Sequence, residues 1–308
     1  MKITRRSVLQ YSALLSAPLA KAAPRKMTNH LTCGSIGIKA TQLEAIDYAA
    51  RFGFEAAEPQ PVYLATLSTA EIESLTAGIK AKKLVWGSAS LPTDFRKDDA
   101  TFSKDLADLP KQAAALKRAG VTRVGTYVPP ASDTLPYLAN LKQHAKRLGE
   151  CATILGNEGL QLGLEYIGPK TLWASRRYPF VHCMAEMKDL IAAINKPNVG
   201  FVLDSWHWYT AGESAADLRT LSNREIVSVD LNDAPANVPI DQQVDSKREL
   251  PVATGVIDLA EFLNTLNDLA YDGPVRCEPF NSTLRAMTPE QILPVVSESM
   301  KKAFSLIR

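Results

Sequence analysis

The sequence predicts a single-domain α/β protein of the (β/α)8, or TIM barrel, class. Short β-type runs alternate with longer amphipathic stretches, which is typical of a parallel sheet crossed by helices. An open, doubly wound sheet would show the same alternation, but no Gly-x-Gly-x-x-Gly follows the first run. Polar residues end many of the runs instead of gathering at one point, as expected where all strand ends surround one site. The expected domain covers residues 27–308.

Eight strands are expected, each a short apolar run that ends in polar or turn-forming residues. They are 31–38 (LTCGSIGI), 55–59 (EAAEP), 84–90 (LVWGSAS), 123–128 (RVGTYV), 160–166 (LQLGLEY), 199–204 (VGFVLD), 226–232 (IVSVDLN) and 274–280 (PVRCEPF).

The amphipathic stretches between these runs predict helices, several of which end at a glycine. The clearest are 41–53, 103–120, 259–273 and 288–307. Gly53, Gly120 and Gly273 stand where helix C-terminal caps are common. The longer connections around 87–100, 166–181 and 233–257 should form the rim of a site.

Residues 1–22 resemble a cleaved twin-arginine signal peptide. Lys2, Arg5 and Arg6 precede a short apolar stretch, and Ala20 and Ala22 form an Ala-x-Ala cleavage pattern. The apolar stretch is shorter than the roughly 20 residues that span a bilayer, so export followed by cleavage after Ala22 is expected rather than a stable membrane anchor. The expected location is therefore the periplasm.

Removal of this segment leaves a nearly neutral protein. The full chain carries a formal charge of +2, and residues 1–22 contain four basic residues and no acid, so the mature charge is 2 − 4 = −2. This balance does not favour binding to nucleic acid or to an anionic membrane. The four cysteines show no Cys-x-x-Cys spacing, and a protein that folds before export cannot depend on disulfides. We expect mostly buried free thiols.

Four acidic residues recur at the ends of the last four predicted strands. They are Glu165, Asp204, Asp230 and Glu278. Converging carboxylates repel one another, and a bound divalent cation is the simplest way to relieve that repulsion. The pattern therefore predicts a metal-dependent enzyme.

Carboxylate oxygens are hard ligands that suit Mg²⁺ or Mn²⁺ better than zinc. Four of them around one divalent ion leave about two excess negative charges. His207 and Arg248 are the residues expected to offset that excess, and His207 could instead bind the metal.

Other polar and aromatic residues near the predicted strand ends could contact a ligand or serve a structural role. Glu58 ends the second strand and either faces substrate or is structural. Trp206, with its aromatic neighbours, is expected to supply a wall for a ligand, whereas Asp233 is more typical of a turn.

The chain resembles the xylose isomerase-like barrel superfamily of sugar isomerases and epimerases over residues 30–300. The residues that carry this resemblance are GLEYIG, LDSWHWY, VDLNDAP, DSKRELPVATGVIDLAEFLNTL and YDGPVRCEPF. The resemblance implies one divalent cation, Mn²⁺ or Mg²⁺, held by Glu165, Asp204, Asp230 and Glu278. Asp230 departs from the pattern, because many relatives have a histidine there.

The resemblance also implies roles toward a small-molecule sugar. His207 and Arg248 would bind substrate oxygens, and Glu165 and Glu278 would move the proton. Removal of a proton next to a carbonyl, through an enediolate, is chemistry that a metal and two carboxylates can perform. The expected activity is isomerisation or epimerisation of a ketose or keto-sugar, and pairing of such barrels into a homo-oligomer stays open.

Three alternatives remain at this point. A dehydratase or a keto-glycoside lyase would begin with the same proton abstraction, and a non-catalytic periplasmic sugar-binding protein would keep the barrel alone. The third alternative is the DNA-repair endonuclease branch of this barrel, which uses zinc ions held by many histidines. The chain has only four histidines, which argues against that activity.

Overall fold

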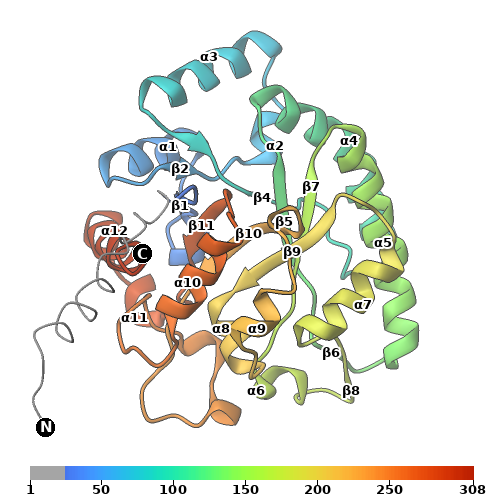
Figure 1. The fold of residues 1–308 in the computed structure, drawn as a ribbon. Helices are drawn as coiled ribbons and strands as arrows, with labels where there is room; N and C mark the ends of the chain where they lie inside the picture. The colour runs from blue at the N-terminus through green and yellow to red at the C-terminus, as the bar shows by residue number, and fades with distance from the viewer. Residues whose placement is uncertain (1–24) are drawn as a thin grey trace, which may run out of the picture.

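The computed structural model describes residues 25–308, so the predicted signal peptide and its cleavage site lie outside the described residues. Figure 1 shows a central ring of strands surrounded by helices, with the first strand beside the last. The sheet order is β3-β2-β1-β11-β10-β9-β7-β5-β4, and all neighbouring strands in it are parallel. The bounds are β1 Thr28–Leu31, β2 Ala56–Ala57, β3 Val85–Trp86, β4 Ala89–Ser90, β5 Arg123–Tyr127, β7 Gln161–Glu165, β9 Val199–Asp204, β10 Ile226–Leu231 and β11 Pro274–Cys277.

The sheet has nine strands, but two of them are halves of one predicted run. β3 pairs with β2, and β4 pairs with β5. β3 and β4 together therefore fill the third barrel position, and the ring has eight positions. The break falls at Gly87 and Ser88. A Cβ built on Gly87 would lie 2.4 Å from the imidazole of the buried His30, so the chain can pass this ring closely only without a side chain. The predicted barrel is confirmed.

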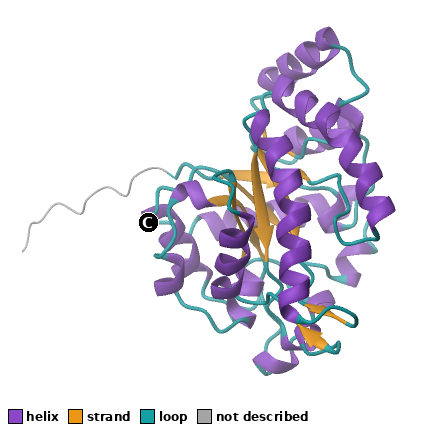
Figure 2. Ribbon diagram, turned by 90° about the vertical axis from the view of Figure 1, so that its right-hand side faces the viewer, coloured by secondary structure: helices purple, strands orange, loops and turns teal. Residues whose placement is uncertain are grey.

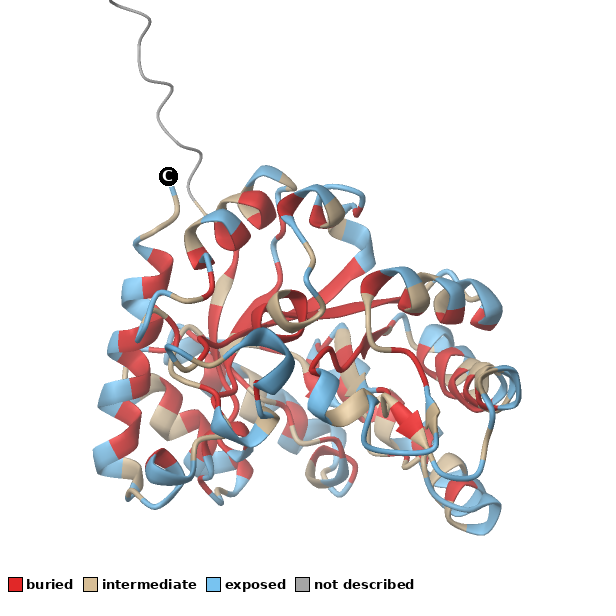
Figure 3. Ribbon diagram, turned by 90° about the horizontal axis from the view of Figure 1, so that it is seen from below, coloured by how far each residue is buried: buried red, intermediate tan, exposed pale blue. Residues whose placement is uncertain are grey.

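Helices cover the outside of the ring (Figure 2). The long ones are α1 Gln42–Arg51, α3 Thr69–Ala81, α4 Asp99–Ala119, α5 Tyr137–Asn157, α7 Met184–Ile194, α10 Leu259–Asp268 and α12 Pro289–Phe304. The short ones are α2 Pro61–Leu64, α6 Lys170–Trp173, α8 Ser205–Thr210, α9 Ala215–Leu218 and α11 Ser282–Arg285. Figure 3 shows that each long helix turns a buried stripe toward the strands and an exposed one outward, as amphipathic periodicity requires.

Two loop strands lie apart from the barrel. β6 (Ala131–Ser132) and β8 (Tyr178–Pro179) form an antiparallel pair that joins the connection after β5 to the connection after β7. This pairing ties the predicted rim connection around 166–181 to the connection after β5, which was not among the predicted rim segments.

Two local predictions were wrong. The first strand ends at Leu31, and Gly34–Ile36 forms a 3-10 turn, in which the Ser35 hydroxyl contacts the backbone oxygens of Thr32 and Cys277. The helix expected to reach Gly273 ends at Asp268. There, Ala270 takes a left-handed φ of 56°, and the amide of Tyr271 donates to the Leu266 oxygen, which turns the tyrosine ring into the core.

Gly120 does cap its helix with a left-handed φ of 83°, as expected. Cys33, Cys151 and Cys277 are buried, Cys183 is half-buried, and all four are free thiols, which confirms the expectation for the cysteines. Within residues 25–308, no helix combines the length and apolar character that crossing a membrane requires.

The contact at Gly87 yields a stability prediction. Gly87→Ala should lower the free energy of unfolding by about 1 to 3 kcal/mol, because the new methyl group must displace the His30 ring in a packed interior. Gly78→Ala is the matched control, since nothing lies within 4 Å of a Cβ there and alanine favours the helix. Denaturant unfolding of both variants measures this. Equal stability of the two would contradict the close-approach argument.

Candidate metal centre

The structure brings the four predicted acids together at the C-terminal end of the barrel. Glu165 and Asp204 are the last residues of β7 and β9, Asp230 lies near the end of β10, and Glu278 directly follows β11. Asp204 and Asp230 are direct register partners. All four side chains are buried, and one oxygen from each lies within 4.8 Å of the others.

A guanidinium that the sequence analysis missed stands among these acids. Arg276 contacts Asp230 through Nε–Oδ1 and Nη2–Oδ2 distances of 2.6 and 2.7 Å, and its Nη2 lies 3.0 Å from Glu278 Oε1. It is two residues before Glu278 in an extended chain, so both side chains point to the same face. That spacing was the available signal.

Arg248 supplies the second guanidinium. It is fully buried, and its Nη1 lies 2.8 Å from Asp204 Oδ2 and 3.4 Å from Glu278 Oε2. Its Nη2 lies 2.7 Å from Asp245 Oδ1. Glu278 therefore joins the two guanidiniums, one through each of its oxygens.

The charges of the cluster do not balance without a cation. The four clustered carboxylates and the two guanidiniums sum to 2 − 4 = −2, which one divalent ion would neutralise; Asp245, a partly exposed fifth carboxylate paired with Arg248, is left out of this sum. The two arginines, rather than His207, supply the offsetting charge. Burial and the Arg248 charge hold the pKa of His207 well below its ordinary value, so this imidazole is neutral.

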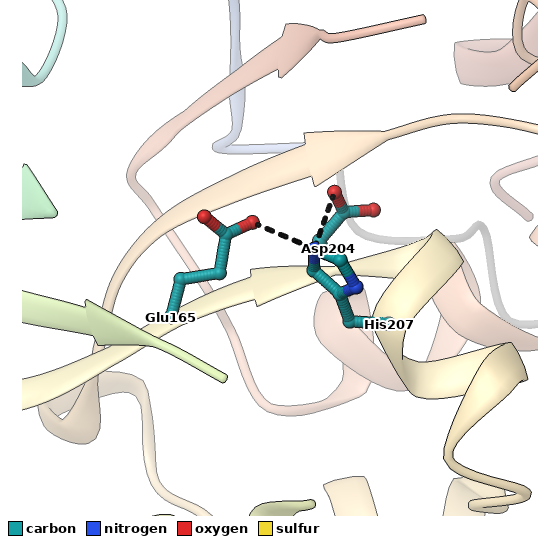
Figure 4. Close-up of side chains that lie close together, drawn as sticks. All are labelled: Glu165, Asp204 and His207. Carbon is teal, nitrogen blue, oxygen red and sulfur yellow. Dashed lines mark ion pairs between the residues drawn. The ribbon is translucent and has the colours of Figure 1, made fainter. Parts of the chain in front are cut away.

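His207 is oriented by its two ring nitrogens. Nδ1 lies 3.2 Å from the backbone N–H of Gly168, and a nitrogen that accepts a hydrogen bond carries no proton. Nε2 lies 3.6 Å from Glu165 Oε1 and 3.9 Å from Asp204 Oδ2 (Figure 4). It also lies 3.1 Å from Arg248 Nη2, and a guanidinium can only donate, so Nε2 is the acceptor in that contact. A neutral imidazole accepts at one nitrogen only, so the donors Gly168 and Arg248 compete and do not fix one tautomer. His207 also forms a group with Glu165 and Asp204 that could hold a metal ion, as the alternative expectation for this residue requires.

The donor set nevertheless fits a divalent cation. Glu165 Oε1 is buried without a hydrogen-bond partner, which is costly unless a ligand satisfies it. Glu165, Asp204 and Glu278 would hold the ion through hard oxygens. Asp230 belongs to the same group, and both of its oxygens accept from Arg276. Both oxygens of Asp204 and of Glu278 also accept from neighbours.

Burial also shifts the protonation of these acids. Burial first, and then the neighbouring carboxylates, raise the pKa of Glu165 well above its usual range. Burial raises the pKa of Glu278 to about 7 and that of Asp204 to about 6, against the opposing effect of the guanidiniums. Protonation is thus how the cluster relieves its repulsion when no cation is bound.

Asp233 positions the loop that carries Arg248. Its side chain accepts from the backbone amides of Ala234, Thr254, Gly255 and Ile257 at 2.7 to 3.0 Å. Its backbone forms a bridge with Glu249. Asp233 thus caps loop amides with its side chain, but its backbone lies in a β-bridge and not in the expected turn.

An open cavity of about 1020 Å³ lies over the cluster. All three predicted rim segments contribute to its lining, through residues such as Arg96, Arg176 and Arg248. Of the four acids, only Glu165 and Glu278 line the cavity; Asp204 and Asp230 lie behind them.

Of the four sequence-predicted substrate residues only Arg248 lines the cavity, and His207, Trp206 and Glu58 do not. Trp206 is fully buried beneath Arg248, whose guanidinium is 5.7 Å from its ring, and it does not line the cavity. The aromatic surface comes from Tyr127 and Phe280 instead. Glu58 also lies outside the lining, and its Oε1 accepts from the Ser90 hydroxyl at 3.0 Å.

The raised pKa of Glu278 predicts how pH and metal act on stability. Between about pH 4.5 and 7 the unfolded chain releases this proton while the metal-free folded protein keeps it, so the free energy of unfolding falls as pH rises. Mn²⁺ binds the ionised form, so its stabilising effect should be larger at pH 7.5 than at pH 5. Thermal unfolding with Mn²⁺ or with a chelator measures both.

Glu278→Gln should flatten the pH dependence of the metal-free protein, whereas Glu298→Gln, on the exposed face of α12, should not. A Mn²⁺ stabilisation that is the same at both pH values would contradict this account of the cluster.

Comparison with known proteins agrees with this fold. A solved xylose isomerase domain protein from Alicyclobacillus acidocaldarius has a TM-score of 0.79 and 32% identity, covering 91% of this chain and 99% of that one. The IOLI protein, solved with a bound zinc atom, shares the fold at a TM-score of 0.73 and 18% identity, covering 91% of this chain and 98% of that one.

Two curated proteins match about half of the chain. Inosose isomerase of Bacillus licheniformis is 26% identical over 158 residues, which are 51% of this chain and 54% of that protein. A 3-dehydroshikimate dehydratase of Pseudomonas aeruginosa is 29% identical over 158 residues, 51% of this chain and 23% of that protein. The chain thus spans about half the length of the inosose isomerase that it matches. The family model described as xylose isomerase-like TIM barrel matches residues 46–303, and the chain belongs to that family.

Proposed function

We propose that this protein is a metal-dependent isomerase or epimerase that acts on a ketose or keto-sugar by removing a proton next to a carbonyl. The observation that carries the proposal is that two of the four clustered acids, Glu165 and Glu278, line the cavity, whereas the other two lie behind them. Two carboxylates that reach a substrate can take a proton and return it.

The ion would be Mn²⁺ or Mg²⁺, because three or four carboxylate oxygens form a hard donor set. When bound, it would supply Lewis-acid polarisation of the substrate carbonyl. Glu165, Asp204 and Glu278 would hold it, and Asp230 is proposed as the fourth member of the set.

The other proposed roles in catalysis fall to residues of the chain itself. Glu165 keeps one oxygen without a partner, so it is free to accept a proton. Arg248 and Arg276 fix Glu278 from both sides, which holds it in one orientation. The His207 ring lies behind the cavity lining, 3.6 Å from Glu165 Oε1 and 3.1 Å from Arg248 Nη2, so it would position these two groups.

Elimination is the second candidate, and the match to a 3-dehydroshikimate dehydratase favours it. It would begin with the same proton abstraction and end with loss of water from the adjacent carbon, or of an aglycone if the substrate is a keto-glycoside. The two reactions differ only in whether a leaving group departs before the proton returns.

The direct test is incubation of the Mn²⁺-loaded protein in heavy water with inosose, ketoses, 3-dehydroshikimate and 3-keto-glycosides. Deuterium in a substrate of unchanged composition would support isomerisation or epimerisation. Loss of water or of an aglycone would support elimination. The absence of exchange and of product across this panel would contradict both.

Glu165→Gln should lower kcat by at least about a hundredfold while changing KM much less, because general base catalysis is typically worth that much. Metal content should be measured on the same sample, since Glu165 is also a proposed ligand. Glu298→Gln is the matched exposed control. Near-normal turnover of Glu165→Gln with metal still bound would contradict the assignment.

We also propose that the protein is exported to the periplasm through the twin-arginine pathway, on the basis of Arg5 and Arg6. Replacement of both by lysine should leave the precursor in the cytoplasm of a bacterial host that has this pathway. Cell fractionation and the mass of the mature N-terminus check it. Unchanged export of the double variant would contradict the pathway.

A further inference from the structure

Arg96, Arg248 and Arg276 are three of the arginines that line the cavity, and the last two are paired with carboxylates of the cluster. Arg248 contacts Asp204, Asp245 and Glu278, and Arg276 contacts Asp230 and Glu278. Each of these guanidiniums is therefore neutralised by the cluster itself. The third arginine, Arg96, is not neutralised by the cluster of four acids.

Arg96 is held rigidly on the cavity wall. Its guanidinium lies 4.0 Å from the Tyr127 ring centroid and 4.4 Å from that of Phe95. Its Nη2 donates to Thr126 Oγ1 at 2.6 Å. Stacking and this hydrogen bond fix the plane of the group before any ligand arrives, which lowers the entropy cost of binding.

The charge of Arg96 is only partly compensated. Its Nη1 lies 3.3 Å from Asp94 Oδ1, which is its one side-chain ion pair among the described residues. The Asp94 side chain is 36% exposed. Of its five N–H groups, those that bond Asp94 and Thr126 have partners, and Nε has none. Lys97 and Arg176 add two further positive charges at the cavity, and the only ion pair of either in the described structure joins Arg176 to Asp133 at 3.5 Å.

The strand register places this arginine close to the reacting acids. Its partner Thr126 is next to Tyr127, and Tyr127 is the register partner of Glu165 across β5 and β7. Arg96 and Glu165 both line the same cavity. A substrate whose reacting carbon lies at Glu165 would therefore extend toward Arg96.

We propose that Arg96 binds a carboxylate carried by the substrate, so that the substrate is an acidic keto-sugar or an acidic ring ketone rather than an uncharged one. A planar, stacked guanidinium with unused N–H groups matches a carboxylate in shape and charge. This inference rests on the proposed function, because it assumes that the reacting carbon lies over Glu165.

The test compares binding of matched acidic and neutral ketones to the Mn²⁺-loaded protein by calorimetry. The pairs are D-fructuronate with D-fructose, and 3-dehydroshikimate with inosose. At least one acidic member should bind about tenfold or more tightly than its neutral partner, the range expected of a charge-assisted contact. Arg96→Gln should remove that preference and leave the affinity for the neutral member unchanged.

Arg118→Gln is the charge-matched control, since Arg118 is exposed on α4 and far from the cavity lining. Arg96→Lys, which keeps the charge but not the planar group, should retain part of the preference. Unchanged affinity of Arg96→Gln for the neutral probe shows that this variant is folded. The inference is overturned if neither acidic ketone is preferred by the unmodified protein, including the case in which no probe binds. It is also overturned if Arg96→Gln weakens acidic and neutral probes equally.

These outcomes are separable from failure of the proposed function. Preferred binding of an acid that depends on Arg96, without exchange or product, would sustain this inference and contradict the proposed activity. Proton exchange on neutral ketones without any preference for acids would do the reverse.

Discussion

The constraint on which this site depends is the repulsion among four buried carboxylates. Carboxylates are desolvated in the interior, and each raises the cost of ionising the others. Arg248 and Arg276 remove half of that excess: Arg248 pairs with Asp204, Arg276 pairs with Asp230, and both also contact Glu278. What remains is a deficit of two positive charges at a point where several oxygens converge. The geometry therefore creates a strong demand for one divalent cation.

The surrounding structure fixes the positions of Arg248 and Arg276 beside the four acids. Arg248 lies on a long connection that would be free to move, but Asp233 gathers the amides of the same connection and bridges to Glu249 beside it. Arg276 lies on a strand and needs no such anchor. The cavity then exposes only the two glutamates to a ligand, while Arg96 presents a less neutralised charge from the wall. Under the two proposals, acid chemistry and recognition of charge would be separated in space.

Much of this arrangement could be predicted from the sequence, and the exceptions have physical causes. The four acids were visible because each stands at the end of an apolar run, where the barrel directs its functional groups. Arg276 was missed: its spacing to Glu278 indicates a shared face, but its pairing with Asp230 appears only when the ring closes and places β11 beside β10. Trp206 was misplaced for a related reason. It follows Asp204 in the sequence, but the helix that starts there turns its indole into the core.

The central claim is that the acids and the two arginines form one cation site, and an anomalous-difference map from crystals soaked in Mn²⁺ tests it most directly. The account predicts a single strong peak about 2.0 to 2.4 Å from oxygens of Glu165, Asp204 and Glu278, the range of distances for hard divalent ions. The same map decides whether Asp230 joins them or stays with Arg276. No peak at this position, with the arginine contacts unchanged, would contradict the account.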